Sequence, residues 1–229
     1  MDIFRKKPIS IIDGVYNFIE TVDEYIENYD TISRDDRKKA FTPSEVKQVL
    51  LNLCEIAIGN QSVDNLVDIG CGDGFIISSI SANKKIAVDI AIEYLKNIHP
   101  SITRVRCNSE HLPFVSSFSD IVICTDVFEH VQNETYLSNE IDRILKPAGK
   151  LLLAVPWEQD LSIYQSEEYR NNFKQYKYVH LRSVNDQLIK ENFGNNFKIM
   201  ASTMLTIGMK YMKLKPYPIR FIVLQKKGE

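Results

Sequence analysis

The sequence lacks three features that mark particular classes of protein: a close pair of cysteines, an apolar run long enough to span a membrane and the apolar segment of a signal peptide. Its four cysteines, Cys54, Cys71, Cys107 and Cys124, are widely separated, so the chain has no close pair of the kind used by zinc sites and redox motifs. We expect all four to be reduced. No apolar run reaches the ~18 residues that a membrane span needs, and the opening stretch lacks the continuous apolar segment of a signal peptide. The expectation is a cytoplasmic protein.

A strong excess of one charge is also missing. The 28 Lys and Arg residues nearly balance the 30 Asp and Glu residues, which leaves a formal net charge of -2. Nucleic-acid-binding surfaces are ordinarily basic, so the overall charge argues against a nucleic-acid partner. With 229 residues, 44% of them hydrophobic, the chain has enough apolar material for one ordinary core and does not resemble a disordered protein.

The sequence does contain short apolar runs that alternate with helical patterns, which indicates β-α-β units and a parallel sheet. The predicted strands are 66–69, 86–90, 102–107, 120–125, 150–155, 197–203 and 219–225. The predicted helices are 43–58, 74–81, 92–98, 133–145 and 183–192, the last capped by Ser183. The predicted fold is α/β: a Rossmann-like, doubly wound, mixed seven-stranded sheet, mostly parallel, whose antiparallel last strand closes a hairpin with its tip at 210–218.

The two ends of the chain are less regular. We expect residues 1–42 to form an N-terminal helical cap or lid over a main domain of residues 43–229, in which 157–182 and 204–218 are insertions on the substrate side. Residues 13–36 are rich in acid, which we interpret as a solvated face. The alternative is that this acidic stretch docks near the basic C-terminal tail and borders a cleft.

The most informative segment is NLVDIGCGDG, residues 65–74. An apolar strand ends near Asp68, and Gly70, Gly72 and Gly74 then open a helix, where glycine lets the backbone turn sharply and approach a ligand. Asp89 ends the next strand, where a carboxylate can accept both hydroxyls of a ribose. This order of elements predicts the nucleoside-binding half of a doubly wound sheet.

The spacing of the glycines favours one nucleoside over another. Dinucleotide-binding turns read G-x-G-x-x-G, whereas this turn reads G-x-G-x-G. Asp68, just before the turn, would repel a phosphate and attract an ammonium group. S-adenosylmethionine has an adenosine, an α-ammonium and no phosphate, so it is favoured over NAD.

Five segments in order resemble one family. VDIGCGDG, AVDI, RCNSEHLPF, SFSDIVICTDVFEHV and EIDRILKPAGKLLLAVP are similar to successive motifs of class I S-adenosylmethionine-dependent methyltransferases, of the type 11 small-molecule group. The resemblance spans about residues 65–155. It implies contacts with the cofactor from Asp68, Gly70, Cys71, Gly72, Gly74, Asp89 (ribose), Ile90 (adenine), Asn108, Ser109 and Glu110 (adenine edge) and Thr125 (backbone near the sulfonium). Many relatives have Asp where Asn108 stands; Asn keeps an acceptor for the adenine amino group and loses the charge.

Two candidates for chemistry beyond binding come from the same comparison. Asp126, Glu129 and His130 have i, i+3, i+4 spacing, which would place them on one helical face, and they resemble the E-x-x-E-H metal site of ubiquinone-pathway O-methyltransferases and terminal-ribose RNA methyltransferases. Metal binding, action of His130 as a base or substrate ligand, and a structural role all remain open. We do not favour a metal, because one helical turn leaves the ligand shell short and only the distant His180 could complete it. His180, in KYVHLRS, either contacts the acceptor or has a capping or packing role.

These observations predict methyl transfer from S-adenosylmethionine, giving S-adenosylhomocysteine, to an oxygen or nitrogen of a small metabolite or natural-product intermediate. The catalytic candidates are Glu129, His130 and His180. Two alternatives are a macromolecular acceptor, such as a modified peptide or an RNA terminus, and a non-catalytic cofactor-binding subunit that stabilises a partner. The sequence does not define the acceptor or the oligomeric state.

Overall fold

The computed structural model describes residues 3–35, 44–157, 160–162, 167, 180–206 and 218–228. Its strands are β1 (Ser10–Ile12), β2 (Val15–Asn17), β3 (Asn65–Ile69), β4 (Lys84–Asp89), β5 (Thr103–Arg106), β6 (Ser119–Thr125), β7 (Leu145–Pro156), β8 (Phe197–Thr206) and β9 (Pro218–Lys226). Its helices are α1 (Glu24–Arg34), α2 (Ser44–Ile58), α3 (Phe75–Ser79), α4 (Ile92–Lys96), α5 (Glu134–Ile144) and α7 (Asp186–Phe193), with a 3₁₀ turn, η2, at Ser109–His111.

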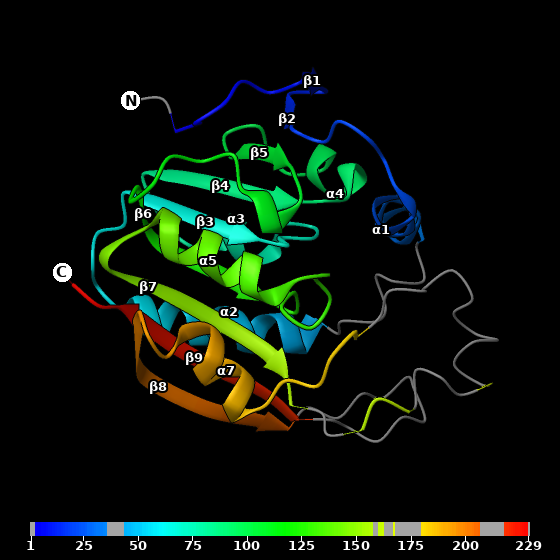
Figure 1. The fold of residues 1–229 in the computed structure, drawn as a ribbon. Helices are drawn as coiled ribbons and strands as arrows, with labels where there is room; N and C mark the ends of the chain where they lie inside the picture. The colour runs from blue at the N-terminus through cyan, green and yellow to red at the C-terminus, as the bar shows by residue number, and fades with distance from the viewer. Residues whose placement is uncertain are drawn as a thin grey trace.

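All described strands belong to one sheet, in the order β1-β2-β5-β4-β3-β6-β7-β9-β8 (Figure 1). The strands from β2 to β7 in this order pair in parallel, and β9 runs antiparallel to both β7 and β8. The predicted α/β class, the mostly parallel sheet and the antiparallel last strand are therefore confirmed. The chain leaves β3 for β4 on one side and reaches β6 on the other, so the carboxyl ends of these three strands surround a topological switch point, where open sheets bind ligands.

The prediction of seven strands was wrong by two, because β1 and β2 lie in the segment expected to be helical. They form a hairpin in which Ile12 pairs with Val15 around Asp13 and Gly14. Both turn residues have positive φ, 51° and 76°, as a two-residue hairpin turn requires. An Asp-Gly pair between apolar stretches is a strong hairpin signal, and β2 then pairs in parallel with β5. Of the proposed helical cap, only α1 is helical in the described residues.

Each face of the sheet is covered by helices. α5 and α7 lie on one face and α2 and α3 on the other (Figure 1). Alternation along the strands divides the side chains between the two layers: Val67 and Ile69 of β3 belong to the core under α5, whereas Leu66 belongs to the core under α2 and α3. This two-sided burial explains why the central strands are apolar runs rather than alternating patterns.

Two local predictions need correction, and two others fall largely outside the described residues. The helix expected from residue 183 begins at Asp186, and the N-cap is Asn185, whose side-chain oxygen accepts a hydrogen bond from the Leu188 amide at 2.9 Å. The strand expected at 150–155 starts at Leu145, because Leu145 pairs with Ser119 before an irregularity in β6. The proposed hairpin tip at 210–218, apart from Pro218 at the start of β9, lies outside the described residues, and so does most of the insertion at 157–182.

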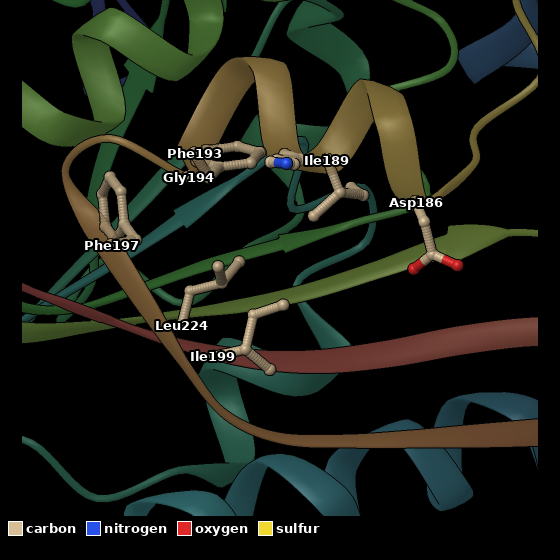
Figure 2. Close-up of a pocket in the computed structure, with 8 residues that line it drawn as sticks. Asp186, Ile189, Phe193, Gly194, Phe197, Ile199 and Leu224 are labelled. Carbon is tan, nitrogen blue, oxygen red and sulfur yellow. The ribbon is translucent and has the colours of Figure 1, made fainter.

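A cavity of about 420 Å³ lies between α7 and the β8–β9 edge (Figure 2). Its lining is mostly apolar, with Ile189 and Phe193 from the helix facing Ile199 and Leu224 from the strands. None of the residues that line it is one of the sequence-predicted site residues. Among the described residues, no helix has both the length and the apolar character needed to cross a lipid bilayer.

Candidate functional site

The glycine-rich turn after β3 has the backbone that its sequence predicts. Gly70, Gly72 and Gly74 all have positive φ, at 67°, 52° and 75°, a region that side chains with a Cβ rarely adopt. Gly74 is the residue before α3, and its amide donates to the carbonyl oxygen of Cys71 at 2.9 Å. Three left-handed residues in five fold the chain into a compact loop at the carboxyl edge of the sheet.

The space beside these glycines differs from one to the next. A Cβ on Gly70 would lie 2.2 Å from a methyl group of Val127, in the loop after β6. A Cβ on Gly74 would lie 2.8 Å from Ile98. A Cβ on Gly72 would meet nothing within 4 Å, so Gly72 faces open space. Close packing therefore favours glycine at positions 70 and 74. At position 72 only the backbone conformation favours it.

Asp68 is a buried carboxyl group one residue from the end of β3. It is 2% exposed, and its Oδ1 atom has no hydrogen-bond partner among the described residues. Burial, reinforced by the nearby carboxylates of Asp89 and Asp73, raises the pKa of Asp68 well above its usual range. A buried carboxylate of this kind is costly without a compensating charge, so the position is suited to a bound cation.

Asp89, at the end of β4, is held against the glycine loop. Its Oδ2 accepts a hydrogen bond from the Gly72 amide at 2.9 Å and its Oδ1 accepts one from the Ala91 amide at 2.8 Å. Each carboxylate oxygen has a further lone pair, so the group can still accept from a ligand hydroxyl. The next residue, Ile90, packs beside Tyr25 and Ile26 of α1.

The remaining predicted cofactor residues lie around the same edge but have local structural tasks. Asn108 caps η2, accepting a hydrogen bond from the Glu110 amide at 2.9 Å. Glu110 is buried, and its Oε1 accepts from the Gln132 amide at 2.9 Å. Cys71 is buried, with its thiol pKa raised well above the usual value by burial. Their contacts with an adenine or a methionine group, like those of Ser109 and Thr125, stay predictions.

A second group of side chains meets next to the end of β6. One ligand atom from each of Asp126, Glu129, His130 and His180 can be chosen so that all four lie within 4.8 Å of one another. We call this group the Asp–Glu–His–His cluster. The rings of His130 and His180 meet edge to face with centroids 4.9 Å apart. The cluster brings together all three predicted catalytic residues, including the one that lies far along the chain.

Glu129 is at the centre of the Asp–Glu–His–His cluster and is completely buried. Its Oε1 atom lies 3.8 Å from Nε2 of His130 and 4.0 Å from Nε2 of His180. The expectation that Asp126, Glu129 and His130 share a helical face was wrong, because these residues form a turn and α5 starts only at Glu134. The turn is closed by the His130 amide, which donates to the Val127 carbonyl at 2.9 Å.

Comparison with known proteins finds sequence similarity to methyltransferases. Residues 67–153 match the model of a methyltransferase domain family. The chain is 32% identical over 151 residues to an uncharacterised protein of Methanocaldococcus jannaschii, covering 66% of this chain and 62% of that one. It is 27% identical over 97 residues to a probable S-adenosylmethionine-dependent methyltransferase of Mycobacterium tuberculosis, covering 40% and 35%. The chain therefore spans less than two thirds of these relatives.

A solved structure supports the same fold. A putative methyltransferase from Bacillus halodurans superposes with a TM-score of 0.63 at 18% identity, covering 79% of this chain and 99% of that one. Residues 67–153 therefore match a methyltransferase domain, and these similarities support the predicted class I S-adenosylmethionine-dependent methyltransferase family.

The cofactor of this family fits the residues present. S-adenosylmethionine brings an α-ammonium, and the buried Asp68 carboxyl group beside the glycine loop is suited to such a charge. Gly72 leaves open space at the loop, and Asp89 retains acceptor capacity for ribose hydroxyls. The Asp68 and Asp89 carboxyl groups next to the glycine turn thus have the chemistry that the ammonium and the ribose of this cofactor require, and their contacts with it stay predictions.

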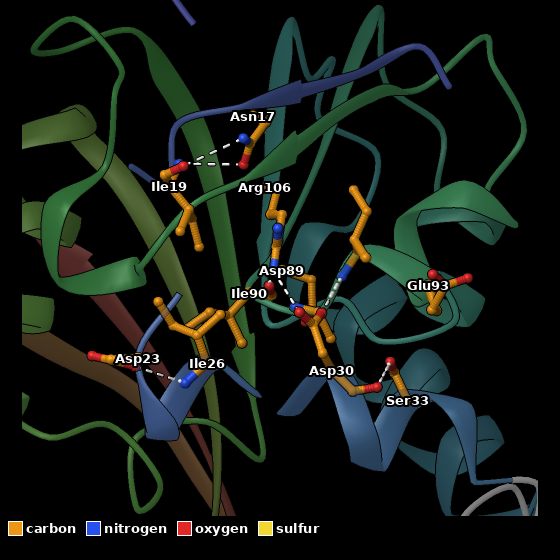
Figure 3. Close-up of polar contacts among 12 residues, drawn as sticks. Asn17, Ile19, Asp23, Ile26, Asp30, Ser33, Asp89, Ile90, Glu93 and Arg106 are labelled. Carbon is orange, nitrogen blue, oxygen red and sulfur yellow. Dashed lines mark hydrogen bonds and ion pairs between the residues drawn. The ribbon is translucent and has the colours of Figure 1, made fainter. Parts of the chain in front are cut away.

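Sequence reasoning missed two residues that shape this methyltransferase site. Asp30 of α1 and Arg106 at the end of β5 form a buried ion pair, with Oδ2 and a guanidinium nitrogen 2.6 Å apart (Figure 3). Arg106 also donates from Nε to the Ile90 carbonyl at 3.0 Å, and Asp30 Oδ1 accepts from the Ile92 amide at 3.0 Å. The interpretation of the acidic segment as a solvated face was therefore wrong for Asp30. A partner so far away in the sequence leaves no spacing pattern that could have revealed it.

These contacts place α1 over the edge of the site. The Tyr25 hydroxyl donates to the His130 carbonyl at 3.3 Å, and the Tyr29 ring lies edge-on to the His130 ring at 6.3 Å. Burial raises the pKa of both phenols above the usual tyrosine value. α1 therefore touches both the predicted adenine side, at Ile90, and the Asp–Glu–His–His cluster.

Proposed function

We propose that this protein transfers the methyl group of S-adenosylmethionine to an oxygen or nitrogen of a small acceptor molecule. The observation that carries the proposal is the buried Asp68 carboxyl group, unpartnered at Oδ1, next to a glycine loop that Asp89 holds in place. This arrangement suits a ligand with an adenosine and an ammonium group and without a phosphate. The family assignment supports the same cofactor.

Methyl transfer requires little covalent chemistry from the protein. The acceptor's lone pair forms a bond to the methyl carbon, the carbon–sulfur bond breaks with its electron pair going to sulfur, and the acceptor's proton leaves. The protein must align the acceptor with the methyl group and assist loss of the proton. In this proposal Asp68, Gly72 and Asp89 orient the cofactor, and Glu129, His130 and His180 receive the acceptor.

The position of the Asp–Glu–His–His cluster supports its role as the acceptor side. β6 pairs directly with β3, so the turn after β6 and the glycine loop after β3 lie at adjacent strand ends. Val127 of that turn packs on Gly70, which brings the two loops into contact. The aromatic Tyr29 and His130 rings would border a small acceptor at this point. The cluster is thus beside the predicted methyl donor rather than on another face.

The proposal is tested in two stages. Isothermal titration of the full chain with S-adenosylhomocysteine should show one binding site, and absence of binding by folded protein would contradict the cofactor assignment. Incubation with S-adenosylmethionine and fractionated metabolite pools should then give a methyl-sized mass increase in one acceptor. Cofactor binding with no turnover, and with stabilisation of a co-purified partner instead, would favour a non-catalytic subunit. A mass increase only in peptide or RNA fractions would favour a macromolecular acceptor.

A further inference from the structure

We propose that the Asp–Glu–His–His cluster binds a divalent metal cation of the Mn²⁺ type. In the sequence only Asp126, Glu129 and His130 are close together, which is too few ligands for a metal. The structure adds a fourth ligand, because His180 lies beside Glu129 and His130 despite its distance along the chain. In the part of the chain that the structure describes, no other group of three or more His, Cys, Asp and Glu side chains brings its ligand atoms close enough together to hold one metal ion.

The donor atoms are suited to such a cation. Two carboxylates and two imidazoles give an oxygen and nitrogen set, which first-row divalent ions accept, and the imidazoles favour Mn²⁺ over Mg²⁺. Ligands of one such cation lie at most about 4.4 Å from one another. The four atoms already lie within 4.8 Å, so small side-chain rotations would bring them around a common centre.

Charge and burial point the same way. Glu129 is completely buried, and the side chain of His180 is only 6% exposed. Removing a carboxylate from water is costly unless a positive charge compensates it closely. A divalent cation bound among these residues would balance the charges of both Glu129 and Asp126. Asp126 is exposed, which leaves the cluster open to solvent and to a ligand on one side.

The two segments that supply the ligands are held together by contacts that involve no side chain of the cluster. The Leu181 amide donates to the Glu129 carbonyl at 2.9 Å. The Arg182 guanidinium donates to the carbonyls of Phe128 at 2.9 Å and Gln132 at 3.2 Å, and its Nε lies 3.1 Å from a carboxylate oxygen of Glu134. These contacts fix His180 beside the turn without using any side chain of the cluster. The site is therefore built by the fold, as preorganised metal ligands require.

The consequence for the substrate rests on the proposed function. A cation at this place would bind an acceptor through oxygen and lower the pKa of a coordinated hydroxyl group, which assists loss of its proton. It would therefore favour methylation of an oxygen over methylation of a nitrogen. The acceptor class is a small molecule with a hydroxyl group, ideally beside a second oxygen that the same cation can bind.

The test measures metal binding alone, on the full chain freed of metal with EDTA and returned to chelator-free buffer. Titration with Mn²⁺, followed by calorimetry and by the electron paramagnetic resonance signal of free Mn²⁺, should show one site. Glu129→Gln and His180→Gln should each weaken it roughly 100-fold or more. His99→Gln is the matched control, because this exposed histidine lies outside the cluster and should leave the affinity unchanged.

A second measurement needs no variant. The chain has four histidines, so a spectrum of ¹⁵N-labelled side chains contains four imidazoles. Mn²⁺ should broaden the signals of His130 and His180 at substoichiometric amounts, before those of His99 and His111 are affected. Four unaffected imidazoles, or undiminished Mn²⁺ binding in folded Glu129→Gln protein, would overturn the metal site. Neither readout involves S-adenosylmethionine, so a failed metal site would leave the methyltransferase proposal standing, and the reverse also holds.

Discussion

The carboxylate of Asp30 and the guanidinium of Arg106 join α1 to the end of β5, at the carboxyl edge of the sheet. Their side chains are 10% and 8% exposed, and the atoms that meet are 2.6 Å apart. Because Arg106 also holds the Ile90 carbonyl, the same guanidinium positions α1 and the predicted adenine-contacting residue. A buried pair of this kind is far more sensitive to the loss of one partner than an exposed pair.

Replacing Arg106 tests this connection. Arg106→Ala leaves Asp30 buried without its cation, and we expect a loss of about 3–5 kcal/mol in the free energy that holds α1 in place. Hydrogen exchange of the amides in α1 should accelerate accordingly. Lys47→Ala is the control, because Lys47 pairs with the half-exposed Asp73 and its loss should cost no more than about 1 kcal/mol. Unchanged exchange in α1 of the Arg106 variant would contradict the role assigned to the pair.

Two substitutions in the glycine loop should affect different properties of the protein, its stability in Gly70→Ala and its cofactor binding in Gly72→Val. Gly70→Ala places a Cβ against Val127, so we expect destabilisation of about 1–3 kcal/mol in addition to backbone strain. Gly72→Val meets only the backbone strain in the protein, but its side chain would occupy the space predicted for the cofactor. Thermal unfolding should thus distinguish Gly70→Ala, and S-adenosylhomocysteine titration should distinguish Gly72→Val. If folded Gly72→Val protein bound the cofactor normally, the open space would belong to something else.

Asp89→Ala should weaken cofactor binding by about 1.5–3 kcal/mol, the usual scale for losing a charged hydrogen-bond acceptor. Asp89 also accepts from the amides of Gly72 and Ala91, so part of the loss would come from a looser loop. Asp89→Asn keeps one acceptor oxygen, so its affinity for S-adenosylhomocysteine should lie between those of the parent protein and of Asp89→Ala. Titration with S-adenosylhomocysteine and with its 2′-deoxy analogue separates the effects, since only the ribose contact is lost with the analogue. An unchanged dissociation constant in Asp89→Ala would refute the ribose assignment.

The raised pKa of Asp68 predicts a pH dependence of both stability and binding. A carboxyl group whose pKa is higher in the folded protein than in the unfolded chain stabilises the fold at low pH, and this contribution is lost as the pH rises through the folded-state value. Cofactor binding requires the ionised carboxylate, so affinity should increase as the pH rises above the ordinary aspartate range, until it reaches the range where an α-amino group loses its proton.

Asp68→Asn isolates this effect. We expect the variant to be more stable than the parent at pH 7 in the absence of cofactor, because the neutral amide removes the cost of burying an ionisable carboxyl group. Its affinity for S-adenosylhomocysteine should be weak and independent of pH over the same range. A parent protein whose affinity does not vary with pH, or a variant that binds equally well, would show that Asp68 does not hold the ammonium group.

The sequence revealed those parts of the site that are local. The glycine turn and Asp89 follow apolar strands directly, so the order of elements was enough to place them at one edge. The Asp–Glu–His–His cluster was only half visible, since His180 reaches Glu129 through a contact between distant segments. The Asp13–Gly14 pair is itself a sequence signal for a hairpin, but it stands at the start of an acidic stretch that was expected to be helical. Buried pairs such as Asp30 and Arg106 depend on tertiary packing and leave no local pattern.

The pairing of β2 with β5 sets an order for the folding of the chain during synthesis. The β1–β2 hairpin closes over two residues and can form as soon as it leaves the ribosome, within microseconds. Its parallel partner β5 is translated only after β3 and β4, so the hairpin must wait as an exposed ribbon until that edge exists. α1 follows the hairpin and docks on Arg106 of the same late strand. The hairpin and α1 are thus translated first but reach their final positions only after β5, so a nascent chain with β3 and β4 in place still lacks the contacts of α1 with Ile90 and Arg106.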